Sequence, residues 1–152
     1  MPLIVHRFDA YPIELEGDLT RIYADAPHFK GLGDQALTTI RNDFNLPNTF
    51  LYAAQFNGRW LAAGIVTGDR QREVRLICVR NMSRQQGIGR KLLNEIKRLE
   101  LSQGCDTLFT RVESGNPAAQ AFLDSLDTQM DQDKTAENEL YYSLLSANFA
   151  SS

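Results

Sequence analysis

The sequence predicts a single α/β (α+β) domain built around a mixed central sheet. Three β-type segments follow one another in the middle of the chain, which indicates an antiparallel meander. A segment with helical periodicity then separates the last of these from another β-type segment, and such a β-α-β unit joins parallel strands. Because we find no internal repeat and no linker, residues 1–152 are expected to form one domain with the element order β-α-α-β-β-β-α-β-α-β.

One strand and two helices are predicted in the first third of the chain. Leu3–Phe8 is the strand, Pro12–Ala24 has helical periodicity, and Pro27 ends that helix. After a loop that contains glycines, Asp34 is placed to cap a second helix. Apolar residues at helical spacing mark the two buried faces, which are Leu15, Leu19, Ile22 and Tyr23 in the first helix and Leu37, Ile40 and Phe44 in the second.

The clearest local signal is a β-hairpin. Thr49–Phe56 and Trp60–Thr67 are rich in β-forming residues, and Asn57-Gly58 between them tolerates the positive φ angles of a tight turn. Glu73–Val79 is then the third strand of the meander. Simple alternation predicts two opposite faces for this strand, Val74, Leu76 and Cys78 on one and Arg75, Ile77 and Val79 on the other.

The rest of the chain supplies the β-α-β-α-β part of the predicted order. An amphipathic helix is predicted over Ile88–Leu101, with Gly104 as its C-terminal stop. Cys105–Val112 has the composition of a buried strand. Asn116-Pro117 supplies a cap and a first-turn proline for another helix, and Glu139–Leu145 is the final strand.

Composition and charge narrow the class of protein. Apolar residues make up 43% of the chain, which is enough for a core without disulfides, and the formal net charge of −3 lacks the basic excess of general nucleic-acid binders. No apolar run approaches the roughly 20 residues that cross a bilayer, and the first residues lack a secretion signal. Cys78 and Cys105 fit no metal motif and are expected to be free buried thiols. We therefore expect a cytoplasmic protein without metal, nucleic-acid or membrane partners.

The segment between Val79 and Leu92 has the pattern of an anion site. A strand ends, a short turn follows, and a helix begins at Gly87 and Gly89. The first N–H groups of a helix lack internal partners, the dipole is positive there, and glycine lets the backbone approach an anion closely. Three basic side chains add positive charge, Arg84, Arg90 and Lys91. The alternative is a solvated loop before an ordinary helix. The absence of a Gly-Lys-Ser/Thr ending excludes a P-loop, and the lack of a third glycine argues against a dinucleotide site.

At this point the sequence resembles a known family. The motif Arg84-Gln85-Gln86-Gly87-Ile88-Gly89 is similar to the Gln/Arg-x-x-Gly-x-Gly/Ala signature that GNAT acetyltransferases carry between the corresponding strand and helix. A later element of that family is matched by Asn116, Ala119 and Phe122, and the resemblance covers Thr49–Leu145. It implies the GNAT fold, with helices on both faces of the sheet, and acetyl-CoA as cosubstrate or ligand.

The resemblance also implies how acetyl-CoA is bound. Its pyrophosphate would lie on the N–H groups of Gln86–Arg90, and its pantetheine arm would pair like an extra strand beside Ile77–Val79. The thioester carbonyl would accept a backbone N–H near Val79 or Arg80. The cofactor-binding residues implied in this way are Ile77, Cys78, Val79, Arg80, Arg84, Gln85, Gln86, Gly87, Ile88, Gly89, Arg90, Asn116, Ala119 and Phe122.

The catalytic residues of an acetyltransferase are not evident. Many GNAT enzymes carry a general-acid tyrosine after the aromatic residue of the late helix, and that position is Leu123 here. Glu73 and Glu113 are candidate bases, for which a solvated strand-end carboxylate is the alternative. Tyr141 or its neighbour Tyr142 is a candidate acid, for which core packing is the alternative.

A closer resemblance bears on this question. Leu51–Asn57, Leu61–Ala63 and Leu92–Glu95 are similar to PanM/PanZ, the GNAT-fold acetyl-CoA sensors that promote maturation of the pyruvoyl aspartate decarboxylase. Asp18–Tyr23 also resembles the first helix of that family. Two hypotheses follow. The chain is an N-acetyltransferase that acts on an unidentified amine, or it is a non-catalytic acetyl-CoA sensor that regulates a partner protein such as aspartate decarboxylase.

Overall fold

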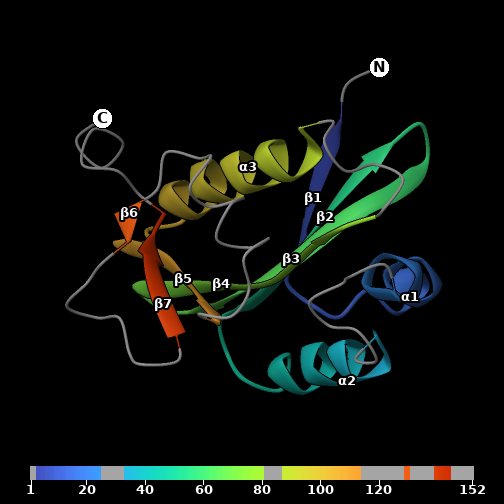
Figure 1. Cartoon of the computed structure of the whole chain (residues 1–152). Helices are drawn as coiled ribbons and strands as arrows, with labels where there is room; N and C mark the ends of the chain where they lie inside the picture. Colours follow the sequence, from blue (N-terminus) through green and yellow to red (C-terminus); the bar gives the residue numbers. More distant parts are fainter. Residues whose placement is uncertain (1–2, 25–32, 81–86, 114–128, 131–138, 145–152) are drawn as a thin grey trace.

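A computed structural model describes residues 3–24, 33–80, 87–113, 129–130 and 139–144 of the chain. These residues form a seven-stranded mixed sheet with the strand order β1-β2-β3-β4-β5-β7-β6 (Figure 1). The elements are β1 (Ile4–Phe8), the 3-10 helix η1 (Ile13–Leu15), α1 (Glu16–Ala24), α2 (Gly33–Asp43), β2 (Thr49–Phe56), β3 (Arg59–Gly68), β4 (Gln71–Val79), α3 (Ile88–Ser102), β5 (Thr107–Glu113), β6 (Gln129–Met130) and β7 (Glu139–Ser143).

The strand pairing confirms the mixed sheet. β1 to β4 pair antiparallel with their neighbours, β4 and β5 are parallel, and β7 pairs antiparallel with both β5 and β6. The parallel pair follows from α3, because a helical crossover returns the chain to the same end of the sheet. The helix predicted after Asn116-Pro117 lies outside the described residues, and the two-residue strand β6 was not expected.

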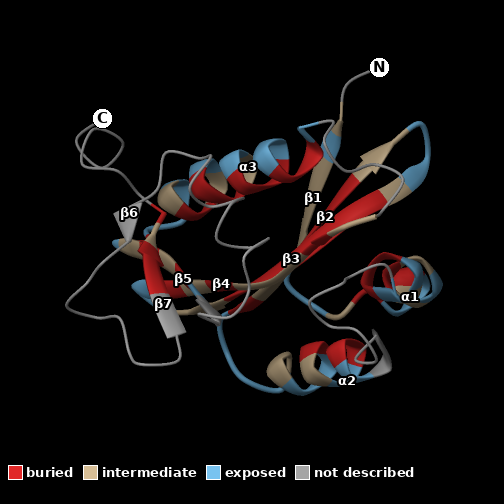
Figure 2. Ribbon diagram, in the orientation of Figure 1, coloured by how far each residue is buried: buried red, intermediate tan, exposed pale blue. Residues whose placement is uncertain are grey.

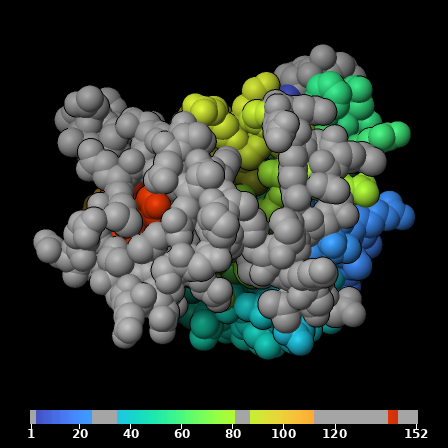
Figure 3. Space-filling model, in the orientation of Figure 1, coloured from blue at the N-terminus to red at the C-terminus, as the bar shows by residue number. Residues whose placement is uncertain are grey.

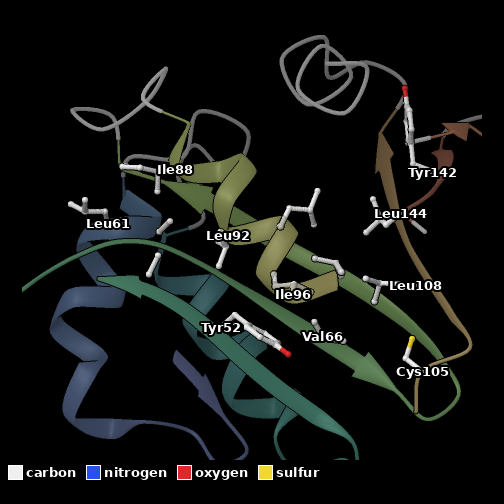
Figure 4. Close-up of a cluster of buried hydrophobic side chains, with 14 residues drawn as sticks. Tyr52, Leu61, Val66, Ile88, Leu92, Ile96, Cys105, Leu108, Tyr142 and Leu144 are labelled. Atoms are coloured by element: carbon white, nitrogen blue, oxygen red, sulfur yellow. The ribbon is translucent and has the colours of Figure 1, made fainter. Parts of the chain in front are cut away.

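Helices cover both faces of the sheet, as the GNAT resemblance implied. α3 lies on one face and α1 with α2 on the other, and the buried side of each helix is turned toward the strands (Figures 1 and 2). Two separate apolar clusters fill these layers. The cluster under α3 includes Ile88, Leu92 and Ile96, which point at the sheet (Figure 4). On the molecular surface, the start of α3 and the helix α2 lie at opposite edges of the view (Figure 3).

Several local predictions are confirmed with small shifts at the ends. Asn57 and Gly58 have φ angles of 52° and 77°, as a tight hairpin turn requires, and Gly104 has a φ of 88° after α3. The first helix begins as the 3-10 turn η1, because the N–H of Leu15 bonds to the carbonyl of Pro12 three residues earlier at 2.9 Å. The second helix begins one residue before the predicted cap, at Gly33.

The simple alternation predicted for the third meander strand is wrong at its centre. Val74 packs in the cluster under α3 together with Ile77 and Val79, whereas Leu76 and Cys78 pack in the cluster under α1 and α2. The cause is a β-bulge. Ala63 pairs with Cys78 and Ile65 pairs with Arg75, so two residues of β4 lie opposite the single residue Gly64. Each extra residue in a strand reverses the faces of everything after it.

Candidate functional site

The strand β4 changes its partners halfway along. Its ladder with β5 joins Gln71 to Thr107, Arg72 to Leu108 and Glu73 to Phe109. One further link follows, in which the hydroxyl of Thr110 donates to the carbonyl of Val74 at 2.7 Å. Within the described strands the β4–β5 ladder ends at this point, although β4 runs on to Val79 and β5 to Glu113. The last third of β4 therefore pairs with β3 along one edge. Its other edge, on the side of β5, lies beyond the end of the β4–β5 ladder.

The direction of the backbone groups in this last third follows from two hydrogen bonds. The carbonyl of Val74 points to the β5 edge, because it accepts from Thr110. The N–H of Arg80 points to the β3 edge, because it donates to the carbonyl of Leu61 at 2.8 Å. Backbone groups of successive strand residues point to alternate edges, so the N–H of Val79 is directed to the β5 edge. Without the bulge, Val74 and Arg80 would share one edge, because they are an even number of residues apart.

Helix α3 begins a short distance beyond this strand. Gly87, its N-cap residue, has φ 76° and ψ 10°, a left-handed conformation that a residue with a side chain adopts only at a cost. A Cβ atom at Gly87 would meet no atom within 4 Å. Glycine is therefore favoured here by the positive φ angle and not by a lack of room for a side chain. The N–H of Lys91 makes the first helical bond, to the carbonyl of Gly87 at 3.0 Å.

The start of α3 has the electrostatics of an anion site. The N–H groups of Ile88 and Gly89 precede the first helical bond, and helix geometry gives them no carbonyl four residues earlier within the helix. The first turn carries no acidic residue, and Arg90 and Lys91 are exposed there. The positive end of the helix dipole is thus reinforced by basic side chains and is not compensated by a carboxylate of its own first turn.

The structure describes only part of the predicted cofactor site. Ile77, Val79 and Ile88 contribute side chains to the layer under α3, Gly89 is buried, and Arg80 lies at the strand end. The side chain of Cys78 turns to the opposite layer. Six predicted residues lie outside the described part of the chain, namely Arg84, Gln85, Gln86, Asn116, Ala119 and Phe122, as does Leu123.

The candidate catalytic side chains that the structure describes are engaged in structural contacts. Both carboxylate oxygens of Glu73 accept from Arg111, at 2.8 and 2.9 Å, which ties β4 to β5. Tyr141 is buried and stacks on Phe109 with ring centroids 4.7 Å apart. Tyr142 belongs to the apolar cluster under α3 (Figure 4). Glu113 lies in β5, but its side chain is outside the described part of the chain.

A buried polar cluster that the sequence did not indicate lies at the other end of α3. Glu100 is fully buried and accepts from Arg72 at 2.7 Å, from Arg7 at 3.0 Å and from the hydroxyl of Tyr52. The guanidinium of Arg7 also lies 3.7 Å from the ring centre of Phe50. Burial, together with the hydrogen bond to Glu100, raises the pKa of Tyr52 well above its usual value. The available signal was that Glu100 continues the apolar stripe of the helix, four residues after Ile96.

Neither a metal centre nor a disulfide emerges from the described residues. Among them, no three His, Cys, Asp or Glu side chains are grouped so that they could hold a metal ion. Cys78 and Cys105 are both buried and are not joined, as predicted, and burial raises the pKa of the Cys105 thiol. None of the helices in the described part of the chain is long and apolar enough to cross a membrane.

Several solved structures that superimpose on most of this chain are described as acetyltransferases. The PaiA N-acetyltransferase of Thermoplasma acidophilum in complex with coenzyme A superimposes with a TM-score of 0.76 at 10% identity, over 94% of this chain and 98% of that one. The ribosomal-protein-S18-alanine N-acetyltransferase of Escherichia coli gives 0.70 at 17% identity, over 93% and 91%. A GNAT-family acetyltransferase of Staphylococcus aureus also gives 0.70, at 15% identity, over 93% and 99%. At these identities the likeness shows the fold.

Sequence comparison gives a more specific result. A family model described as "Acetyltransferase (GNAT) domain, PanZ" matches residues 4–136, which include β1, the bulged strand β4 and the whole of α3. None of the curated protein sequences matches the chain significantly.

Proposed function

The chain belongs to the PanZ family of GNAT acetyltransferase domains, and from this premise we propose that it binds acetyl-CoA where β4 meets the start of α3. The observation that carries the proposal is the direction of the Val79 N–H, toward the edge on which the β5 ladder has ended. An extended ligand chain added at that edge meets a backbone donor, as in strand-addition recognition.

Two portions of acetyl-CoA, the pyrophosphate and the pantetheine arm, suit the two parts of this junction. The pyrophosphate is an anion, and the glycine-led start of α3 offers it backbone N–H groups and a positive dipole, with Arg90 and Lys91 nearby in sequence. The pantetheine arm lies along Ile77–Val79. Two donors are expected for the thioester carbonyl, the N–H groups of Val79 and Arg80. The N–H of Arg80 is directed to the β3 edge and that of Val79 to the β5 edge, so we assign Val79 from its direction.

For the use of the bound acetyl-CoA, the described side chains favour regulation over catalysis. Glu73 is held by both of its oxygens in the pair with Arg111, and Tyr141 is stacked on Phe109. These contacts are typical of residues that stabilise a sheet, and Leu123 cannot donate a proton to a leaving thiolate. We therefore infer an acetyl-CoA sensor that regulates a partner protein, of which aspartate decarboxylase is the candidate suggested by the PanM/PanZ resemblance.

Acetyl transfer to an amine is the second candidate, and the family fold favours it. Positioning of the thioester can by itself supply a large part of the rate, so the lack of an evident acid does not exclude this reaction.

The test combines calorimetry with a thiol-release assay on the purified chain. Titration with acetyl-CoA and, separately, with CoA measures binding. Primary amines are then added to the acetyl-CoA complex. The sensor proposal expects binding without amine-dependent release of thiol, and acetyl-CoA-dependent co-elution with purified aspartate decarboxylase. Amine-dependent thiol release would establish the enzyme instead, and no heat with either ligand would refute both.

A further inference from the structure

We propose that Tyr23 of α1 is a positioning residue that holds the β4 bulge and so aims the Val79 N–H at the thioester carbonyl of acetyl-CoA. The inference rests on the proposed function and deepens it, because it names the residue on which discrimination between acetyl-CoA and free CoA depends.

The bulge contains an unfavourable backbone conformation. Leu76 has a φ of 55°, in the left-handed region that residues with side chains rarely adopt. Leucine has no short polar side chain to stabilise this conformation locally, as asparagine or aspartate has. The contacts around Leu76 must therefore hold it there.

Two hydrogen bonds between β4 and the last turn of α1 supply such contacts. The hydroxyl of Tyr23 donates to the carbonyl of Leu76 at 2.7 Å, and the Tyr23 side chain is fully buried. Two residues further along β4, the thiol of Cys78 donates to the carbonyl of Ile22 at 3.1 Å. Burial raises the pKa of Tyr23 well above its usual value, so the hydroxyl stays protonated and remains a donor.

The opposite side of the bulge is closed by β3. A Cβ atom on Gly64 would lie 3.0 Å from Cγ1 of Ile77 and 3.5 Å from its Cα. Gly64 therefore lets the bulged residues approach β3, while Tyr23 fixes the carbonyl of Leu76 toward α1. The bulge is therefore held from α1 by hydrogen bonds, of which the Tyr23 hydroxyl makes the one to Leu76, and from β3 by close packing at Gly64.

The bulge decides which N–H reaches the ligand edge. Its extra residue moves Arg80 to the β3 edge and Val79 to the β5 edge. A thioester carbonyl is present in acetyl-CoA and absent from free CoA. Loss of the bulge geometry is therefore expected to weaken acetyl-CoA binding while CoA binding, which relies on the start of α3 and the pantetheine arm, changes little.

The experiment is the ratio of acetyl-CoA affinity to CoA affinity in Tyr23→Phe, measured by calorimetry. The substitution keeps the ring and removes one hydroxyl, and we expect the ratio to fall about three- to tenfold, the usual worth of one neutral hydrogen bond. Tyr52→Phe is the matched control, because it removes the hydroxyl of another buried tyrosine whose partners are Glu100 and Arg7. This control should lose stability and keep the wild-type ratio.

A rescue separates positioning from general loss of stability. Glycine adopts positive φ freely, so Leu76→Gly added to Tyr23→Phe should restore the ratio without restoring the hydroxyl. If Tyr23→Phe does not fold, Leu76→Val tests the same point, because a β-branched residue disfavours the bulge with Tyr23 in place.

The outcomes distinguish this inference from the function on which it rests. A wild-type preference for acetyl-CoA that is unchanged in Tyr23→Phe would overturn the role of Tyr23 alone. A preference that is unchanged in Leu76→Val would overturn the role of the bulge, and that of Tyr23 with it. Wild-type protein that binds both ligands equally would overturn the thioester contact of the proposed function, and the role of Tyr23 with it.

Discussion

The two halves of β4 show how one strand serves two purposes. The first half, Gln71–Val74, is paired on both edges, and its side chains reach Glu100 of α3 and Arg111 of β5. The second half, Ile77–Val79, pairs with β3, follows a bulge, and presents a backbone N–H to the edge where the β5 ladder ends. The comparison teaches that the first half is held in the sheet by its side-chain contacts and acts as a scaffold. The second half is suited to a ligand by the direction of its backbone N–H groups.

The largest effect is expected from a substitution that removes the side-chain contacts of the first half of β4. Glu100→Leu removes the acceptor for Arg7 and Arg72 and leaves two guanidinium groups near the core, which should destabilise the chain by about 3 kcal/mol. Urea unfolding measures the loss. Glu95→Gln is the control, since Glu95 pairs with Arg98 on the exposed side of the same helix and should change stability little. Equal effects in the two variants would contradict the scaffold role.

The next prediction concerns the ligand side of the comparison, at the start of α3 beyond the second half of β4. Gly87→Ala should lower acetyl-CoA affinity about tenfold, because the helix start can relax to negative φ and binding must then restore the strained conformation. Gly58→Ala is a matched control, with a φ of 77° against 76° and equally open space, but in the hairpin turn. It should cost similar stability and keep the affinity. Equal affinities for the two variants would refute the anion site.

Alkaline pH should test both halves of β4, because each depends on a tyrosine whose pKa is raised. Tyr23 bonds directly to Leu76, and Tyr52 bonds to Glu100, the acceptor of Arg72. A hydroxyl whose folded pKa exceeds its unfolded value keeps its full contribution below the usual 10.0 and loses it as pH rises further. Stability should fall by about 1.4 kcal/mol per pH unit above that value for each tyrosine. Urea midpoints between pH 9 and 11 check this, and Tyr52→Phe should show a shallower slope than wild type. An identical slope would argue against the raised pKa of Tyr52.

The smallest effect concerns the packing of the bulge. Gly64→Ala places a Cβ 3.0 Å from Cγ1 of Ile77, which must shift, and should destabilise the chain by about 1 kcal/mol. Shortening the neighbour in Gly64→Ala/Ile77→Val should recover most of this loss. A double variant no more stable than Gly64→Ala would mean that the contact is not limiting.

Local features of the fold could be predicted from the sequence, because they depend on residues that are close along the chain. Asn57-Gly58 specifies its turn through its own φ preferences, and the stripe of α3 repeats within a few residues. The start of α3 could likewise be predicted from the residue type and the spacing of its glycines.

The features that depend on distant residues could not be predicted in this way. Nothing local to Leu76 indicates a positive φ, since its partner Tyr23 lies 53 residues earlier. Gly64, a lone glycine within a strand, was the one available sign of a bulge. Glu73 has the pattern of a solvated strand-end carboxylate until β5 brings Arg111 to it, 38 residues later.

The most direct test of the acetyl-CoA site is an NMR titration of the ¹⁵N-labelled chain with acetyl-CoA. We expect the largest amide shifts at Ile77–Val79 and Gly87–Gly89, with the Val79 amide moving further for acetyl-CoA than for CoA. Shifts confined to other elements, or none at saturating ligand, would contradict a site at the junction of β4 and α3.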